Sequence, residues 1–253
     1  MDPAAPVVRI ARLALAFVVL AGCGGKVIRL GNATAGTGGG GATGMDGGGR
    51  ADGGVTCQHG LVNANEVLFV GDSWVRIPGT QPLDTRVRDL ARAAGAIGPT
   101  EDYVDLAVGG TTIAAIASQY NTQEAGATKV RVLVMDGGGW DTILAGGSDA
   151  SVTSVVNTFT QHLAKVASDG TAQHIVYFLY PELQTIPGVA ALRPGVRQAC
   201  SDSTVPCDFL DLQLSWPNHP EYTAADGIDA SDSGAKLIAD QIWAIMQLNC
   251  IAQ

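Results

Sequence analysis

Several apolar runs in this chain stop abruptly at glycine, acidic or hydroxyl residues, and this pattern constrains the fold more than any other feature. The clearest run, Glu66–Val70, is followed directly by Gly71, Asp72 and Ser73. A short run of Val, Leu and Phe bounded in this way is typical of a buried strand in a parallel sheet. By the same reasoning, we expect strands at residues 66–70, 103–108, 130–135, 174–180 and 209–212.

Segments with helical spacing separate these runs. One example is the stretch after Pro82, where Val87, Leu90 and Ala91 recur on one side of the predicted helix. We expect helices at residues 83–94, 113–120, 151–167 and 232–246, and a surface loop at residues 181–194, which contain proline and glycine. Strands that alternate with helices predict an α/β fold, with a mostly parallel sheet of about five strands covered by helices on both faces.

The first 22 residues have the pattern of an export signal. Arg9 and Arg12 precede the apolar run 13–20, which is too short to span a bilayer well. The run ends in Leu20-Ala21-Gly22-Cys23, which resembles a bacterial lipobox, so we expect residues 1–22 to be removed and Cys23 to carry a lipid. An ordinary signal cleaved near the same place is the alternative.

Residues 23–56 are expected to form a flexible tether. Half of the residues from 31 to 54 are glycine, and almost none could be buried in a core. The remaining segment, 57–253, has the length of one ordinary domain with a substantial core.

Charge and composition bear on which partners the chain can bind. The formal net charge is −9, and no basic stripe with interleaved aromatic residues is present, which argues against nucleic acid. We expect a monomer that touches the membrane only through the lipid on Cys23. The predicted location is a bacterial membrane facing the periplasm or the cell surface.

Four cysteines remain besides Cys23: Cys57, Cys200, Cys207 and Cys250. An even number in an exported chain favours disulfides, and sequence alone allows three pairings. We expect Cys57 to pair with Cys250 and Cys200 with Cys207. A zinc site is the competing interpretation, but the spacings fit neither a ribbon nor a finger.

Ser73 stands at the carboxyl end of the first predicted strand. Ligands of open α/β sheets bind just outside the carboxyl ends of strands, so this position suits a nucleophile. Asp72 and Ser73 could also serve only as a turn and helix cap. These residues alone leave both interpretations open.

Four blocks together resemble the SGNH (GDSL-type) hydrolases. In chain order they are Val-Gly-Asp-Ser at residues 70–73, Gly-Gly-Thr-Thr at 109–112, Gly-Gly-Trp-Asp at 138–141 and Asp-Gly-Ile-Asp-Ala-Ser at 226–231. Four blocks in register are much more specific than one. The resemblance covers roughly residues 65–248 and implies a flavodoxin-like α/β hydrolase that acts on lipid, acyl or acetylated-sugar esters without a cofactor or metal.

The resemblance also implies roles for individual residues. Ser73 matches the nucleophile, and its amide together with that of Gly110 matches the oxyanion hole. Asp226 matches the acid that orients the catalytic histidine. A serine hydroxyl needs a base to accept its proton, and the developing oxyanion needs preorganised donors.

The sequence departs from the family pattern at two positions. Trp140 stands where the family has the asparagine that donates to the oxyanion, although the indole N–H offers one donor. Asp229 stands where the catalytic histidine belongs, and a carboxylate is an intrinsically weaker base than imidazole. Beside Asp226 its pKa could be raised by like-charge repulsion. His219, ten residues earlier on a predicted loop, is a possible substitute base.

The sequence therefore predicts a serine-dependent ester hydrolase that works through an acyl-enzyme, with Ser73, Asp226 and Asp229 as catalytic residues. The alternative is an impaired relative that binds a glycan or acylated ligand without hydrolysing it. Trp74 and Trp140 could line an acyl or sugar site, or pack in the core.

Overall fold

The computed structural model describes residues 62–251, so the predicted signal, the lipobox and the whole predicted tether lie outside the described residues. Five parallel strands form one sheet in the order β2-β1-β3-β4-β5. The strands are β1 (Val67–Val70), β2 (Val104–Asp105), β3 (Val132–Met135), β4 (His174–Leu179) and β5 (Cys207–Asp211). The α/β class and the number of strands are as predicted.

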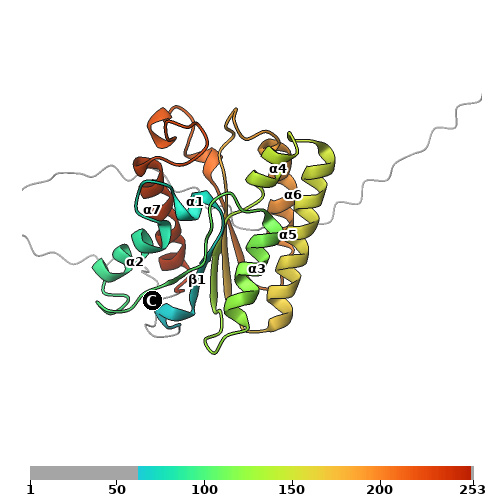
Figure 1. Ribbon diagram of the computed structural model, residues 1–253. Coiled ribbons are helices and arrows are strands. Elements are labelled where there is room, and N and C mark those ends of the chain that lie inside the picture. Colours follow the sequence, from blue (N-terminus) through green and yellow to red (C-terminus); the bar gives the residue numbers. More distant parts are fainter. Residues whose placement is uncertain (1–61, 252–253) are drawn as a thin grey trace, which may run out of the picture.

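Helices cover both faces of the sheet. Figure 1 shows α2 and α7 on one face and α3, α5 and α6 on the other. The helices are α1 (Ser73–Arg76), α2 (Leu83–Ala93), α3 (Ile113–Glu124), α4 (Gly139–Leu144), α5 (Asp149–Asp169), α6 (Val189–Ser201) and α7 (Asp232–Leu248). Short 3-10 turns lie at η1 (Ala64–Glu66), η2 (Leu212–Leu214) and η3 (Pro220–Tyr222).

The central strands form the core. Every residue of β1, β3 and β4 is buried, which agrees with the uninterrupted apolar runs in the sequence. Because the strands are parallel and in register, with Val70 opposite Met135 and Leu179 opposite Asp211, their carboxyl ends meet at one edge. We call this the carboxyl-terminal edge.

The prediction of a surface loop over residues 181–194 is wrong in its second half. Helix α6 begins at Val189 and includes Pro194, because its apolar side, with Leu192 and Val196, is buried. Packing of that side outweighs the backbone hydrogen bond that a proline removes. Two short helices, α1 and α4, were also not predicted, because a helix of one or two turns has too few residues to show a period.

The predicted disulfide between Cys200 and Cys207 is confirmed, and it joins α6 to β5. Cys250 is disulfide-bonded as well, while Cys57, its predicted partner, lies outside the described residues. Among residues 62–251, no helix is long and apolar enough to cross a membrane.

Candidate active site

The turn after β1 presents Ser73 at the carboxyl-terminal edge. Gly71 has φ +155°, and a Cβ there would lie only 2.0 Å from Asp136 Oδ1. The close approach of this turn to the residue after β3 therefore requires glycine. The side-chain amide of Gln119 binds both backbone groups of Gly71, accepting from its N–H (2.8 Å) and donating to its carbonyl (3.1 Å). Asp72 then caps α1, its Oδ1 accepting from the N–H of Trp74 (3.0 Å). The turn is a helix cap, as one interpretation of the sequence predicted, and it leaves Ser73 partly exposed.

Two buried carboxyls lie directly beneath this turn. The backbone N–H of Asp72 donates to Asp136 Oδ1 (2.8 Å), and the hydroxyl of Tyr180 donates to Asp72 Oδ2 (2.9 Å). Burial raises the pKa of both Asp72 and Asp136, and the neighbouring Asp72 charge raises that of Asp136 further. Two carboxylates in a dry core resist ionising together, so we expect Asp136 to keep its proton when Asp72 is ionised.

The turn after β2 lies against Ser73 on one side and Trp140 on the other. A Cβ at Gly109 would lie 3.7 Å from Ser73 Cβ, and one at Gly110 would lie 3.8 Å from Trp140 Cε2. Gly110 has φ +69°, the left-handed region that favours glycine. The carboxylate of Asp141 accepts the N–H of Ile113 (2.9 Å) and so ties the third turn to the second. Three of the four blocks therefore meet at one place.

The fourth block brings a carboxyl to Ser73. Asp229 is only 9% exposed. Burial raises the pKa of its carboxyl, and the charge of Asp226 raises it further, while hydrogen bonding from the Ser73 hydroxyl lowers it. Asp229 Oδ1 is buried without a hydrogen-bond partner among residues 62–251.

Asp226 supports the backbone around Asp229. Its Oδ1 accepts the N–H groups of Ile228 (2.8 Å) and Asp229 (3.0 Å), and these bonds hold its pKa below the ordinary value. The pKa values of two neighbouring carboxyls are thus shifted in opposite directions: backbone donors lower that of the more exposed Asp226, and burial raises that of Asp229.

None of the histidines within residues 62–251 forms a hydrogen bond to Ser73. The ring of His219 hydrogen bonds through Nδ1 to Glu221 (2.8 Å) and stacks on Tyr222 with 4.5 Å between ring centroids. His174 Nε2 pairs with Asp208 (2.6 Å), and His162 is buried in α5. His59 lies outside the described residues. Within residues 62–251, the carboxyl of Asp229, rather than a histidine ring, lies near enough to the Ser73 hydroxyl for that hydroxyl to lower its pKa.

The two tryptophans at the site differ in burial. Trp74 is 1% exposed and packs between Tyr180 and Trp216, with ring centroids 5.3 Å apart in both pairs, so it belongs to the core. Trp140 is partly exposed and lies beside Gly110. Its indole N–H makes no hydrogen bond within the described part of the chain, which leaves it available as a donor.

Sequence reasoning missed Asp136, Tyr180 and Gln119, which hold the Ser73 turn from other elements. A weak signal existed for Asp136, because it ends the apolar run of β3 much as Gly71 and Asp72 end that of β1. No group of three or more His, Cys, Asp or Glu side chains within residues 62–251 could hold a metal ion.

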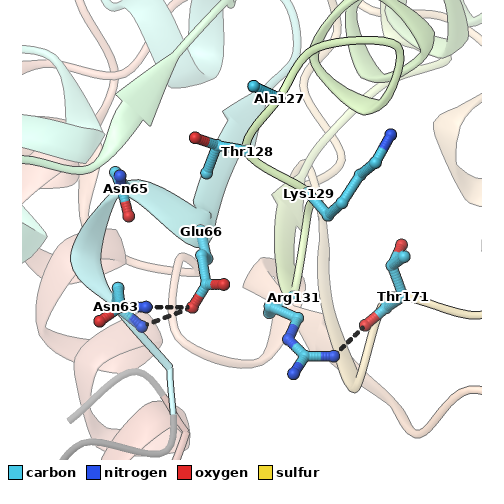
Figure 2. A pocket seen from close by; sticks show the side chains of 8 residues that line it. All are labelled: Asn63, Asn65, Glu66, Ala127, Thr128, Lys129, Arg131 and Thr171. Carbon is cyan, nitrogen blue, oxygen red and sulfur yellow. Dashed lines mark hydrogen bonds between the residues drawn. The ribbon is translucent and has the colours of Figure 1, made fainter.

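A separate cavity of about 400 Å³ lies at the opposite, amino-terminal ends of the strands (Figure 2). Its lining is polar and consists of Asn63, Asn65, Glu66, Ala127, Thr128, Lys129, Arg131 and Thr171. The carboxylate of Glu66 accepts a hydrogen bond from the backbone N–H of Asn63 (2.7 Å), and Arg131 donates to the carbonyl of Thr171 (3.4 Å). These side chains stabilise the loops between elements and lie far from the Ser73 turn.

Comparison with known proteins gives no match among family models or among curated proteins. Solved structures do match. A family 3 carbohydrate esterase of Clostridium thermocellum is 20% identical with TM-score 0.59, covering 73% of this chain and 96% of that chain. A lipase/acylhydrolase of Enterococcus faecalis is 16% identical with TM-score 0.59, covering 72% and 96%.

A family 3 carbohydrate esterase of Talaromyces cellulolyticus is 14% identical with TM-score 0.59, covering 73% of this chain and 97% of that chain. A putative GDSL-like lipase of Parabacteroides merdae is 16% identical with TM-score 0.56, covering 72% and 94%. Likeness at such low identity establishes the fold. The chain has the SGNH (GDSL-type) hydrolase fold, as its four sequence blocks predicted.

Proposed function

We propose that the protein hydrolyses carboxylic esters through an acyl-enzyme on Ser73. The observation that carries this proposal is the meeting of Ser73 with the Gly109–Gly110 turn and the buried carboxyl of Asp229 at one edge of the sheet. A nucleophile, backbone donors and a proton acceptor are the parts that acyl transfer needs. Structural neighbours bearing the names carbohydrate esterase and lipase support an ester as the substrate.

Each part has a role in this mechanism. The hydroxyl oxygen of Ser73 attacks the ester carbonyl, and the amides of Ser73 and Gly110 donate to the oxyanion that forms. The indole N–H of Trp140, which lies against Gly110, supplies the third donor in place of an asparagine. The loss of one such donor typically slows catalysis about 100- to 1,000-fold, so the position of the indole bears strongly on the rate.

The substrate class follows only as far as an acyl ester. Acetylated sugars, short acyl esters and lipids are all compatible with the proposal, and a panel of esters separates them.

We further propose that the domain is exported and anchored through a lipid on Cys23. Metabolic labelling with palmitate should mark the full-length chain and not the Cys23→Ala variant.

The test is hydrolysis of p-nitrophenyl acetate, butyrate and octanoate and of acetylated xylan. We expect at least one substrate to be turned over by the wild type and by Ser118→Ala, which removes an exposed hydroxyl on α3. Ser73→Ala should reduce that rate to the uncatalysed background. Equal rates in Ser73→Ala and the wild type would contradict the proposal, as would the absence of hydrolysis across the panel.

A further inference from the structure

The proton acceptor at the site differs chemically from the imidazole of the family pattern. We propose that Asp229 is the base that activates Ser73, with Asp226 as its charged partner, so that the esterase keeps working at acidic pH where an imidazole base is protonated. This inference rests on the proposed esterase function and names the group that carries the proton. It also predicts the pH regime in which the enzyme operates.

The backbone around Asp229 is fixed, which a base needs. The carbonyl of Asp229 accepts the N–H of Ala224 (2.8 Å), and Thr223 pairs with Ala230 in an antiparallel bridge. Asp226 holds the N–H of Asp229 from within the same turn (3.0 Å). Ser231 follows as the N-cap of α7. The carboxyl is therefore held at Ser73 by the local fold rather than by a mobile loop end.

The side chain of Asp229 has an unused hydrogen-bonding atom. Its Oδ1 is buried without a partner among the described residues, although the residue is only 9% exposed. A buried carboxylate oxygen without a donor is unfavourable by roughly 1–3 kcal/mol or more. A proton from Ser73 removes the charge from this buried carboxylate and so relieves the cost of its burial during the attack of Ser73 on the ester.

The charges around Asp229 are acidic. Burial is the largest cause that raises the pKa of Asp229. The charges of Asp226, in the same turn, and of Asp72, after β1, raise this pKa further, while the Ser73 hydroxyl on α1 lowers it. The backbone donors on Asp226 lower the pKa of that second carboxyl. When two neighbouring groups are shifted apart in this way, one stays charged and the other exchanges a proton. Asp229 is the group placed to exchange it.

The reaction balances with water as the only co-reactant. Ser73 Oγ bonds to the ester carbon while its proton moves to the Asp229 carboxylate. The bond to the leaving alcohol then breaks, and Asp229 returns the proton to the alcohol oxygen. In the second half, water bonds to the acyl carbon and gives a proton to Asp229. The Ser73 Oγ–carbon bond breaks, Ser73 regains the proton, and a carboxylic acid leaves. Asp229 becomes a neutral acid that can donate to ionised Asp226.

The test is the pH dependence of p-nitrophenyl ester hydrolysis from pH 4 to 8 in four proteins: wild type, Asp229→His, Asp229→Asn and Asp232→Asn. An imidazole base with pKa about 6.5 loses about tenfold of its activity between pH 7.5 and 5.5. We expect Asp229→His to show this loss and the wild type to lose less. Asp229→Asn should lower kcat by about 100-fold or more at every pH, whereas Asp232→Asn, an exposed acid three residues away, should match the wild type.

Two outcomes separate this inference from the proposed function. Hydrolysis that depends on Ser73, persists in Asp229→Asn and falls with a pKa near that of imidazole would overturn the inference alone. Loss of the activity in His219→Ala would then identify the rival base. Absence of Ser73-dependent hydrolysis at every pH would overturn both. The wild-type profile needs no substitution, so misfolding of Asp229→Asn would not prevent the decision.

Discussion

Buried carboxyls at the carboxyl-terminal edge occupy two different settings. Asp211, at the end of β5, is 6% exposed and is paired with two cations, Arg193 and Arg197, the latter at 2.6 Å. Asp72 and Asp136, beside Ser73, are also buried, but Asp136 accepts a backbone N–H and Asp72 accepts the hydroxyl of Tyr180. In the first setting two cations face the carboxyl, while in the second burial raises the pKa of both carboxyls. The difference locates proton chemistry at the centre of the sheet and structural ion pairing at its side.

The largest effect is expected from a substitution that breaks the ion pairs of Asp211. Asp211→Ala leaves Arg193, with a side chain 12% exposed, without its main partner. Removal of one member of a buried pair typically destabilises by about 3–5 kcal/mol, and we expect the lower part of this range because Glu182 lies 3.6 Å from Arg193 Nε.

Urea unfolding measures this loss of stability. The control is Lys165→Ala, which breaks a more exposed i,i+4 pair on α5 and should cost less than about 1 kcal/mol. Equal losses of stability in Asp211→Ala and Lys165→Ala would show that the buried ion pairs of Asp211 stabilise the fold no more than an exposed pair does.

A smaller effect is expected in the setting that lacks cations. Tyr180→Phe removes the hydroxyl that donates to Asp72 Oδ2, and a hydrogen bond to a charged group contributes about 1.5–3 kcal/mol. Tyr120→Phe is a matched control, because its hydroxyl also donates to a carboxylate, Asp169, which keeps Lys165 as a partner. Thermal unfolding should show the greater loss in Tyr180→Phe. The comparison fails if Tyr120→Phe is the more destabilised variant.

The last expected effect is a change in the pH dependence of stability. The pKa of Asp136 is raised in the folded protein, so its contribution is fully present below the unfolded pKa of about 3.9 and is lost as pH rises through the folded pKa. Asp136→Asn, which resembles the protonated acid, removes this dependence.

Urea unfolding at pH 4 and pH 8 tests the sign. Between these values the wild type should lose more stability than Asp136→Asn, by up to about 1.4 kcal/mol for each unit by which the folded pKa is raised. Identical losses would mean that Asp136 holds no proton in the folded state.

Much of this arrangement could be predicted from local sequence. Uninterrupted apolar runs predict buried parallel strands, and parallel strands bring their following turns to one edge, so Ser73 and Gly110 could be placed together. Asp229 was expected at this edge only from the resemblance of its block to the SGNH hydrolases. Helix α6 could not, since Pro194 argues locally against a helix and only the tertiary packing of Leu192 and Val196 outweighs it.

The supporting residues of the site could not be predicted for a related reason. Tyr180 reaches Asp72 across 108 positions in the sequence, and Gln119 reaches Gly71 across 48. Such contacts depend on the exact position of side chains from different elements, which residue types and spacing do not encode. At Asp229 the sequence predicted the repulsion from Asp226 that raises its pKa, but not the burial that is the larger cause of the shift.

The central claim is that Ser73 is an activated nucleophile, and covalent labelling tests it most directly. Native protein is incubated with a fluorophosphonate probe, digested and mapped by mass spectrometry, with heat-denatured protein and Ser73→Ala as controls. We predict one adduct, on Ser73, in the native wild type and none in either control. Native protein without an adduct on Ser73, or with equal labelling after denaturation, would contradict the account.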